Sequence, residues 1–268
     1  MAAGRVASST ARRAAASGAA FDLDGDGALG VVLIHGFTST PWEVHHLGIR
    51  LAEAGLTAHG PVLPGHGTSV EDLGRTRWED WVAEVDRAID AVHARCDQVA
   101  VVGQSLGGLL ALHAASRRPA IAAVGSLAAP LWLEGLGGRI ARLTAPGGLL
   151  ARIQAIPKLG GSDVRDPRAK AANPGYPAVS TRALAQLVAF MNIADAALPA
   201  ITQPVLVLHA TQDHTAPVAC AHRIAERARA RRLRILPDSF HLIAVDVERE
   251  IVAAEVIQFL RTHALPRA

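Results

Sequence analysis

The chain has few of the residues that mark several classes of protein. Its 268 residues contain two cysteines, Cys96 and Cys220, which lie far apart and lack the spacing of metal ligands. No apolar run reaches the length of about 18 residues that a membrane-spanning helix needs. We therefore expect two buried free thiols, no transmembrane segment and a location in the reducing cytoplasm.

Aromatic residues and unbalanced charge are scarce as well. Aromatic side chains make up 4% of the chain, and the formal net charge is only +3. Because no cluster of basic residues is interleaved with aromatic ones, the sequence gives no support for nucleic-acid binding. Half of the residues are apolar and 19% are charged, which is enough apolar material for a sizeable core.

The amino-terminal residues carry one pattern that resembles a secretory signal and one that resembles a calcium-binding loop, but each lacks a required feature. Residues 1–20 are rich in Ala, Ser and Arg but lack the continuous apolar stretch of a secretory signal, so we expect a disordered leader. Residues 21–27 look like the start of a calcium loop. The position that should supply a bidentate Glu is Leu33, which excludes calcium binding and favours a turn before the first strand.

From there, short apolar runs alternate with helical patterns. Six predicted strands alternating with helices indicate an α/β fold with a mostly parallel, doubly wound sheet. The predicted strands are 31–34, 57–62, 99–102, 121–128, 204–209 and 232–236. The predicted helices are 41–54, 76–95, 106–117, 181–197, 216–229 and 248–262.

The alternation stops in the middle of the chain. Residues 131–198 are rich in glycine and proline but keep enough Leu and Ile to pack, and they are too long for a simple connection. We expect them to form a small cap, or lid, inserted into a core made of residues 21–130 and 199–268. An apolar, glycine-rich cap predicts an apolar pocket beneath it.

Residues 99–107 carry a pattern that indicates a catalytic serine. The apolar run that begins at Val99 leads into Gly103-Gln104-Ser105-Leu106-Gly107, and a helical pattern follows. Strand, sharp turn and helix in this order are typical of the G-x-S-x-G nucleophile elbow. The elbow predicts a strained backbone at Ser105, with glycines on either side because a Cβ there would collide with the neighbouring strand and helix.

A serine hydroxyl needs a base, and the base needs a carboxylate partner. His241 follows the last predicted strand and Asp213 follows the strand before it, so both lie with Ser105 at the carboxyl ends of the strands. The order Ser, Asp, His is the one expected of this fold. Asp246 competes with Asp213 for the role of acid, but its place just after His241 favours support of the last helix.

The oxyanion of a tetrahedral intermediate needs backbone donors. We expect them at Leu106, which begins the helix after the serine, and at Phe37, which follows the first strand. The nearby histidines are expected to shape loops rather than to react, and for His66 a turn position is favoured over the pocket wall. These histidines are His35, His66, His209 and His214.

Several blocks, joined in order, resemble the bacterial carboxylesterases and monoacylglycerol lipases of the α/β-hydrolase family. The blocks are residues 35–41, 63–68, 77–81, 103–108, 211–214 and 239–246, with a further echo at 161–167. The resemblance implies an α/β-hydrolase fold with a small lid, activity on short- to medium-chain acyl esters or monoacylglycerols, and no metal cofactor.

Position by position, the resemblance implies nucleophile Ser105, acid Asp213, base His241 and oxyanion amides at Phe37 and Leu106. Two features depart from the family pattern. Gln104 stands before the nucleophile, where relatives more often have Leu. The cap stretch 172–177 is shorter and less acidic than its counterpart in the monoacylglycerol lipases.

These residues predict a two-step acyl transfer that needs neither metal nor organic cofactor. The expected partner is a small ester or monoacylglycerol, with transient contact to lipid aggregates as a further hypothesis. Two alternatives remain open. The same triad could cleave thioesters, open lactones or transfer acyl groups. Alternatively, this chain could be a hydrolase-like protein that holds an apolar ligand without turnover.

Overall fold

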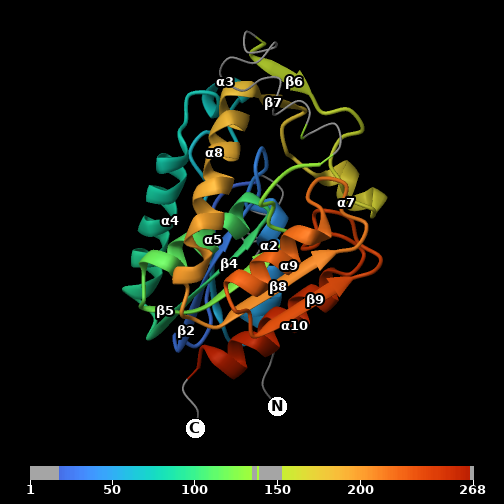
Figure 1. Ribbon diagram of the computed structural model, residues 1–268. Helices are drawn as coiled ribbons and strands as arrows, with labels where there is room; N and C mark the ends of the chain where they lie inside the picture. The colour runs from blue at the N-terminus through green and yellow to red at the C-terminus, as the bar shows by residue number, and fades with distance from the viewer. Residues whose placement is uncertain (1–17, 135–137, 139–152, 266–268) are drawn as a thin grey trace.

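The computed structural model describes residues 18–134, 138 and 153–265 (Figure 1). Seven strands form one sheet in the order β1-β3-β2-β4-β5-β8-β9, and every neighbouring pair is parallel except β1 with β3. The prediction of a mostly parallel sheet is therefore confirmed. The strands are β1 (Phe21–Leu23), β2 (Leu29–Ile34), β3 (Thr57–Gly60), β4 (Gln98–Gln104), β5 (Ile121–Leu127), β8 (Val205–Ala210) and β9 (Arg232–Leu236).

Strand β1 was not predicted. We expected residues 21–27 to form a turn, but the first three of them pair antiparallel with β3. Phe21 and Leu23 are buried while Asp22 is exposed, which is the alternation of a strand with one buried face. Three residues are too few for this pattern to stand out from the acidic and glycine-rich turn that follows them.

Helices cover both faces of the sheet, and their bounds differ from the predicted ones by two residues at most. One face carries α2 (Trp42–Glu53) and α10 (Arg249–His263). The other carries α4 (Trp78–His93), α5 (Leu106–Arg117), α8 (Thr181–Ala197) and α9 (Val218–Arg227). Strand β4 serves both cores, since Val99 and Val101 face one of them and Ala100 and Val102 face the other.

Between β5 and β8 lies a segment, residues 131–198, that we call the insertion. The structure describes its residues 131–134, 138 and 153–198. Its strands β6 (Ala155–Pro157) and β7 (Ala178–Ser180) pair antiparallel, with helix α7 (Pro167–Ala172) between them. The pair lies beside the short helix α3 (Val70–Leu73) at the top of Figure 1. The leader predicted for residues 1–20 lies, up to residue 17, outside the described residues.

Helix α8 ends the insertion with the bounds that the sequence predicts, and the 3-10 turn η1 (Leu198–Ala200) continues it. Within the described residues, Thr181–Ala200 is the one segment long and apolar enough to cross a membrane, with a hydropathy of 1.4. Core helices of globular domains pass the same test. Leu184, Leu187 and Phe190 are buried in the core that α8 shares with α5, which accounts for the apolar composition.

The two cysteines are free and buried, as expected. Cys220 lies in α9, whereas Cys96 lies in the turn between α4 and β4 and not in a helix. Burial raises the pKa of the Cys220 thiol to about 11, so this side chain acts as a small apolar residue of the core.

The junction of β4 and α5 is packed so closely that its glycines have no substitute. A Cβ at Gly103 would lie 2.1 Å from the carbonyl carbon of Gly107, and a Cβ at Gly107 would lie 2.1 Å from the carbonyl oxygen of Ile34. Both obstacles are backbone atoms, which cannot move aside as a flexible side chain can. The predicted reason for the flanking glycines is confirmed.

We predict that Gly103→Ala lowers the free energy of unfolding by about 3 kcal/mol or more, because the methyl group forces strand and helix apart. For a chain of this size that corresponds to a fall of about 6–12 °C in melting temperature, measurable by calorimetry. The control is Gly160→Ala, where no atom lies within 4 Å and only the φ of +86° opposes a side chain. Equal losses in the two variants would contradict the packing argument.

Candidate active site

Ser105 stands at the sharp turn between β4 and α5. Its backbone has φ 56° and ψ −117°, a combination that residues with a side chain rarely adopt. The conformation is held by the strand before it and by a hydrogen bond of 2.8 Å from the Ser105 amide to the carbonyl of Leu127. The predicted strain at this serine is therefore confirmed.

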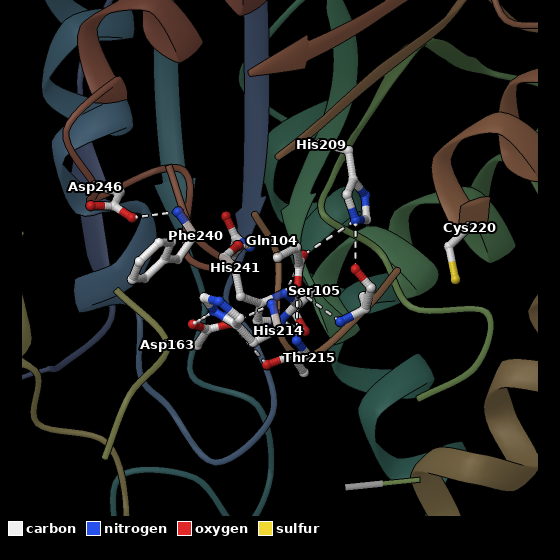
Figure 2. A network of polar contacts seen from close by, with 12 residues as sticks. Gln104, Ser105, Asp163, His209, His214, Thr215, Cys220, Phe240, His241 and Asp246 are labelled. Atoms are coloured by element: carbon white, nitrogen blue, oxygen red, sulfur yellow. Dashed lines mark hydrogen bonds and ion pairs between the residues drawn. The ribbon is translucent and has the colours of Figure 1, made fainter. Parts of the chain in front are cut away.

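The structure brings together the three residues that the sequence singled out. The hydroxyl oxygen of Ser105 lies 2.9 Å from Nε2 of His241 (Figure 2). Nδ1 of His241 lies 2.8 Å from Oδ2 of Asp213. Asp213 follows β8 and His241 follows β9, so both loops leave the same edge of the sheet as Ser105. With Nδ1 protonated, His241 donates to Asp213 and accepts from Ser105.

The Asp213 carboxylate is fully buried and surrounded by donors. Its Oδ1 accepts from the backbone amides of Thr215 at 2.8 Å and Ala216 at 2.7 Å. Burial would raise the pKa of Asp213, but the charges and hydrogen bonds of His241 and His209 outweigh it and hold that pKa well below its usual range. The acid is therefore ionised at neutral pH.

The opposite shift occurs on His241. Burial alone would lower the pKa of its imidazole, yet the charge and hydrogen bond of Asp213 raise the pKa above its ordinary value. The carboxylates of Asp163 and Glu43 act in the same direction. The site thus favours the imidazolium that forms when His241 takes a proton.

His209 is a second partner of the acid that the sequence did not reveal. Its Nε2 lies 3.2 Å from Oδ2 of Asp213 and 3.0 Å from the carbonyl oxygen of Ala216. His214 is turned away from the acid instead. Its Nδ1 lies 2.9 Å from Oδ1 of Asp163, in the insertion. Both histidines hold loops, as predicted for them.

Gln104 connects the elbow to the base. Its Nε2 donates to the carbonyl oxygen of His241 at 2.9 Å, and its Oε1 accepts from the amide of Ala244 at 3.3 Å. The side chain is fully buried. The departure from the family pattern at this position therefore gives the His241 loop a polar support directly beside the serine.

Asp246, the alternative acid, has other partners. Its carboxylate accepts hydrogen bonds from four backbone amides, those of Arg165, Asp166, Phe240 and Val247. Two of these amides belong to the insertion. We expected Asp246 to support the start of the last helix, and its carbonyl oxygen does accept from the amide of Arg249, the first residue of α10, at 3.1 Å. Its carboxylate also ties the insertion to the loop that carries His241.

The loop between β2 and α2, residues 35–41, passes beside the serine. A Cβ at Gly36 would lie 3.3 Å from Cβ of Ser105, so the following residue, Phe37, lies at the edge of the site. His35 is buried and tied to this loop, with Nδ1 2.9 Å from the carbonyl oxygen of Gly36. Leu106 is the first residue of α5, where helix amides lack partners within the helix.

Glu43 also supports the β2–α2 loop, a role that the sequence did not predict. Its Oε2 accepts from the amide of Gly36 at 2.8 Å, and only 3% of the residue is exposed. Burial raises the pKa of this carboxyl group, although the hydrogen bond from Gly36 opposes the rise. The available signal was an acidic residue in the first turn of the helix that follows Phe37.

His66 lies in a turn, which is the position that the sequence favoured. Its Nδ1 is 3.1 Å from the carbonyl oxygen of Pro64, and its ring packs edge-on against His35, Phe37 and Trp81. Burial lowers the pKa of His66 to about 4. It stays neutral and works as part of an aromatic cluster beneath the β2–α2 loop.

A cavity of about 350 Å³ opens onto Ser105 and His241. Its wall contains both apolar and polar residues. The apolar lining residues include Phe37, Leu133, Ile156, Val179, Leu184, Leu187 and Leu242. The polar lining residues include Thr38, Glu43, Lys158, Asp163 and Asn173. Within the described residues, no group of three or more His, Cys, Asp or Glu could hold a metal ion.

Comparison with known proteins places the chain in a family. Residues 28–248 match the model of the Hydrolase_4 family, described as serine aminopeptidase, S33. The thermostable monoacylglycerol lipase of Bacillus sp. (strain H-257) is 32% identical over 241 residues, which cover 89% of this chain and 93% of that protein. The carboxylesterase of Bacillus subtilis (strain 168) is 28% identical over 235 residues, 86% and 91% of the two chains.

Solved structures agree with this assignment. A structure reported for LipS and LipT, two metagenome-derived lipolytic enzymes, superimposes with a TM-score of 0.82 at 27% identity. The match covers 92% of this chain and 98% of that one. The chain therefore belongs to the serine aminopeptidase S33 family and has the α/β-hydrolase fold of its lipase and esterase relatives.

Proposed function

We propose that the protein is a serine ester hydrolase in which Ser105 is the nucleophile, His241 the base and Asp213 the acid. The observation that supports this most is the unbroken chain of hydrogen bonds from Asp213 through His241 to Ser105, ending at an apolar-walled cavity. A serine so connected can attack a carbonyl carbon, and the cavity can bury the acyl chain that the carbonyl belongs to.

In the first half of the reaction, the Ser105 oxygen bonds to the ester carbonyl carbon while its proton passes to Nε2 of His241. The carbonyl oxygen becomes an oxyanion, which the amides of Phe37 and Leu106 stabilise. When the intermediate collapses, the bond to the alcohol breaks and His241 returns its proton to the leaving alkoxide. An acyl-enzyme on Ser105 and a free alcohol result.

The second half repeats these steps with water. His241 takes a proton from a water molecule whose oxygen bonds to the acyl carbon, and the same two amides hold the new oxyanion. Collapse of this intermediate breaks the bond to Ser105, whose oxygen recovers the proton from His241. The products are the carboxylic acid and the free enzyme, so no cofactor takes part.

The substrates that we propose are short- to medium-chain acyl esters or monoacylglycerols. The apolar lining residues of the cavity suit an acyl chain, and its polar lining residues suit an alcohol with hydroxyl groups. The named activities of the relatives, monoacylglycerol lipase and carboxylesterase, are of this class. The two buried free thiols fit our proposal of a cytoplasmic enzyme.

We also propose that residues 131–198 work as a cap on a core of residues 21–130 and 199–268. Leu133, Ile156, Val179, Leu184 and Leu187 come from this segment, and they supply most of the apolar wall of the cavity. A substrate chain would therefore be enclosed between the cap and the carboxyl ends of the strands.

We predict that Ser105→Ala lowers kcat for p-nitrophenyl butyrate by about 10⁴-fold or more, because no other group can form the acyl-enzyme. Release of p-nitrophenol measures the rate. Ser162→Ala is the matched control, since Ser162 lines the same cavity and takes no part in the hydrogen bonds that join Asp213, His241 and Ser105. Full activity in Ser105→Ala would overturn the assignment of the nucleophile.

We expect the wild-type enzyme to prefer esters whose acyl chain is long enough to fill the apolar space of the cavity. Each added methylene that the cavity buries contributes about 0.8 kcal/mol, which raises kcat/KM about fourfold until the space is filled. Esters from acetate to palmitate, run beside 1-monoacylglycerols of equal chain length, give the optimum. If a folded wild type cleaves none of them, the ester proposal fails and thioesters or lactones become the next substrates.

The rate should fall on the acid side as His241 becomes protonated. Because Asp213 raises the pKa of His241, the pH at which kcat/KM falls to half its maximum should lie above the ordinary imidazole pKa of about 6.5.

Asp213→Asn should move this midpoint to lower pH and reduce kcat by about 10⁴-fold. Asp238→Asn, in the same loop as His241, should change neither. A wild-type rate that is flat from about pH 5 to 9 would contradict the histidine base.

We further propose transient contact with lipid aggregates through the cap. Leu159, which lines the cavity, is 80% exposed, and Ile153, which comes shortly before β6, is 40% exposed; both are large exposed aliphatic residues of the cap. The wild type should hydrolyse a micellar ester faster than the same ester kept monomeric. Ile153→Ser should reduce that gain and leave the monomeric rate unchanged. No gain in the wild type would rule out the contact.

A further inference from the structure

The insertion meets the β2–α2 loop at Thr38, the residue after Phe37. Thr38 has φ 63°, in the left-handed region that a β-branched residue rarely adopts. The residue is also buried, with 2% of its surface exposed. A backbone conformation of this kind persists only where surrounding contacts hold it.

Two of those contacts come from the insertion, more than a hundred residues along the chain. The amide of Tyr176 donates to the carbonyl oxygen of Thr38 at 2.8 Å. The ammonium group of Lys158 donates to the hydroxyl oxygen of Thr38, whose own proton goes to the carbonyl oxygen of Phe37. Residues of the insertion thus hold the peptide groups on both sides of Thr38: Tyr176 directly, and Lys158 through the Thr38 hydroxyl.

Tyr176 is itself fixed to the core. Its hydroxyl donates to the carbonyl oxygen of Gly65 at 2.8 Å and accepts from the amide of Thr68 at 2.8 Å. Both partners belong to the loop of residues 63–68, one of the blocks that the sequence analysis singled out without a role. Tyr176, the only tyrosine of the chain, joins this loop to Thr38.

Lys158 stands next to Tyr176 in space. Its backbone amide donates to the carbonyl oxygen of Pro177 at 2.8 Å, where the antiparallel pair β6–β7 begins. Lysine is rare in this chain, which has only Lys158 and Lys170 among 27 lysines and arginines. A compact ammonium group reaches the Thr38 hydroxyl at the cavity wall, where a planar guanidinium would need more room.

We propose that Lys158 and Tyr176 are positioning residues that hold Thr38, and through it the Phe37 amide, in the geometry that the oxyanion requires. The proposal rests on the function assigned above to the Phe37 amide. On this view the insertion completes the oxyanion site in addition to enclosing the acyl chain. A shift of about 1 Å in a donor of this kind can cost about 10²-fold in rate.

The test uses the full-length protein with Lys158→Met, which keeps the length of the side chain and removes the ammonium group. Tyr176→Phe keeps the ring and the backbone amide and removes only the bonds to Gly65 and Thr68. Lys170→Met is the matched control, because Lys170 is the exposed second lysine of the insertion. For each protein we would measure kcat and KM on p-nitrophenyl butyrate and the melting temperature.

A second readout does not depend on turnover. An alkylboronic acid bonds to the serine oxygen and gives a tetrahedral anion, whose oxygen occupies the place of the oxyanion. We expect Lys158→Met to lower kcat about ten- to a hundredfold with KM within about twofold of the wild type. The inhibition constant of butylboronic acid should rise by a similar factor. Tyr176→Phe should give a smaller loss of the same kind, and Lys170→Met none.

A merely structural role would produce a different pattern. Lower melting temperatures with kcat and boronate affinity unchanged would overturn the proposal and leave the ester hydrolase assignment intact. A folded wild type that neither cleaves esters nor binds the boronic acid would overturn both. Labelling of Ser105 by a fluorophosphonate in every variant shows that the nucleophile itself is intact, so that a loss of kcat is then assigned to the oxyanion geometry.

Discussion

The rest of the site depends on one buried charge, the carboxylate of Asp213. A carboxylate with no exposed surface is costly unless every oxygen has partners, and here the amides of Thr215 and Ala216 satisfy one oxygen while His209 and His241 share the other. The same arrangement that keeps the charge ionised fixes the ring of His241. The loop after β8 therefore has little freedom, and the position of the base follows from the burial of the acid.

The insertion is attached to the loops that carry Asp213, His241 and Phe37. Asp163 accepts from His214 in the acid loop, Asp246 in the His241 loop accepts from the amides of Arg165 and Asp166, and Tyr176 donates to Thr38. Asp163, His214 and Thr38 also line the cavity. Since packed elements shift together rather than deform, a movement of the insertion would displace several parts of the proposed site at once.

Much of this arrangement could be predicted from local patterns. The buried strands, the elbow at Ser105 and the placement of Asp213 and His241 after successive strands all follow from residues that are close in sequence. Strand β1 was missed because three residues carry too little periodicity. The contacts of Glu43, His209 and Lys158 were missed for two reasons. Lys158 lies 120 residues from Thr38, so their contact arises only when the insertion meets the β2–α2 loop. The partners of Glu43 and His209 lie seven and four residues away, but these contacts depend on the course of the turn between the elements, which residue spacing alone does not give.

Gln104 shows how such a contact can matter more than its residue type suggests. It precedes Ser105 on the last position of β4, and its amide group holds the carbonyl of His241 and the amide of Ala244. The nucleophile and the residue that supports its base are therefore neighbours in the chain, where β4 ends. Since the distance from Ser105 to His241 must stay near hydrogen-bond length for proton transfer, a common support at the end of β4 limits how far the two can drift apart.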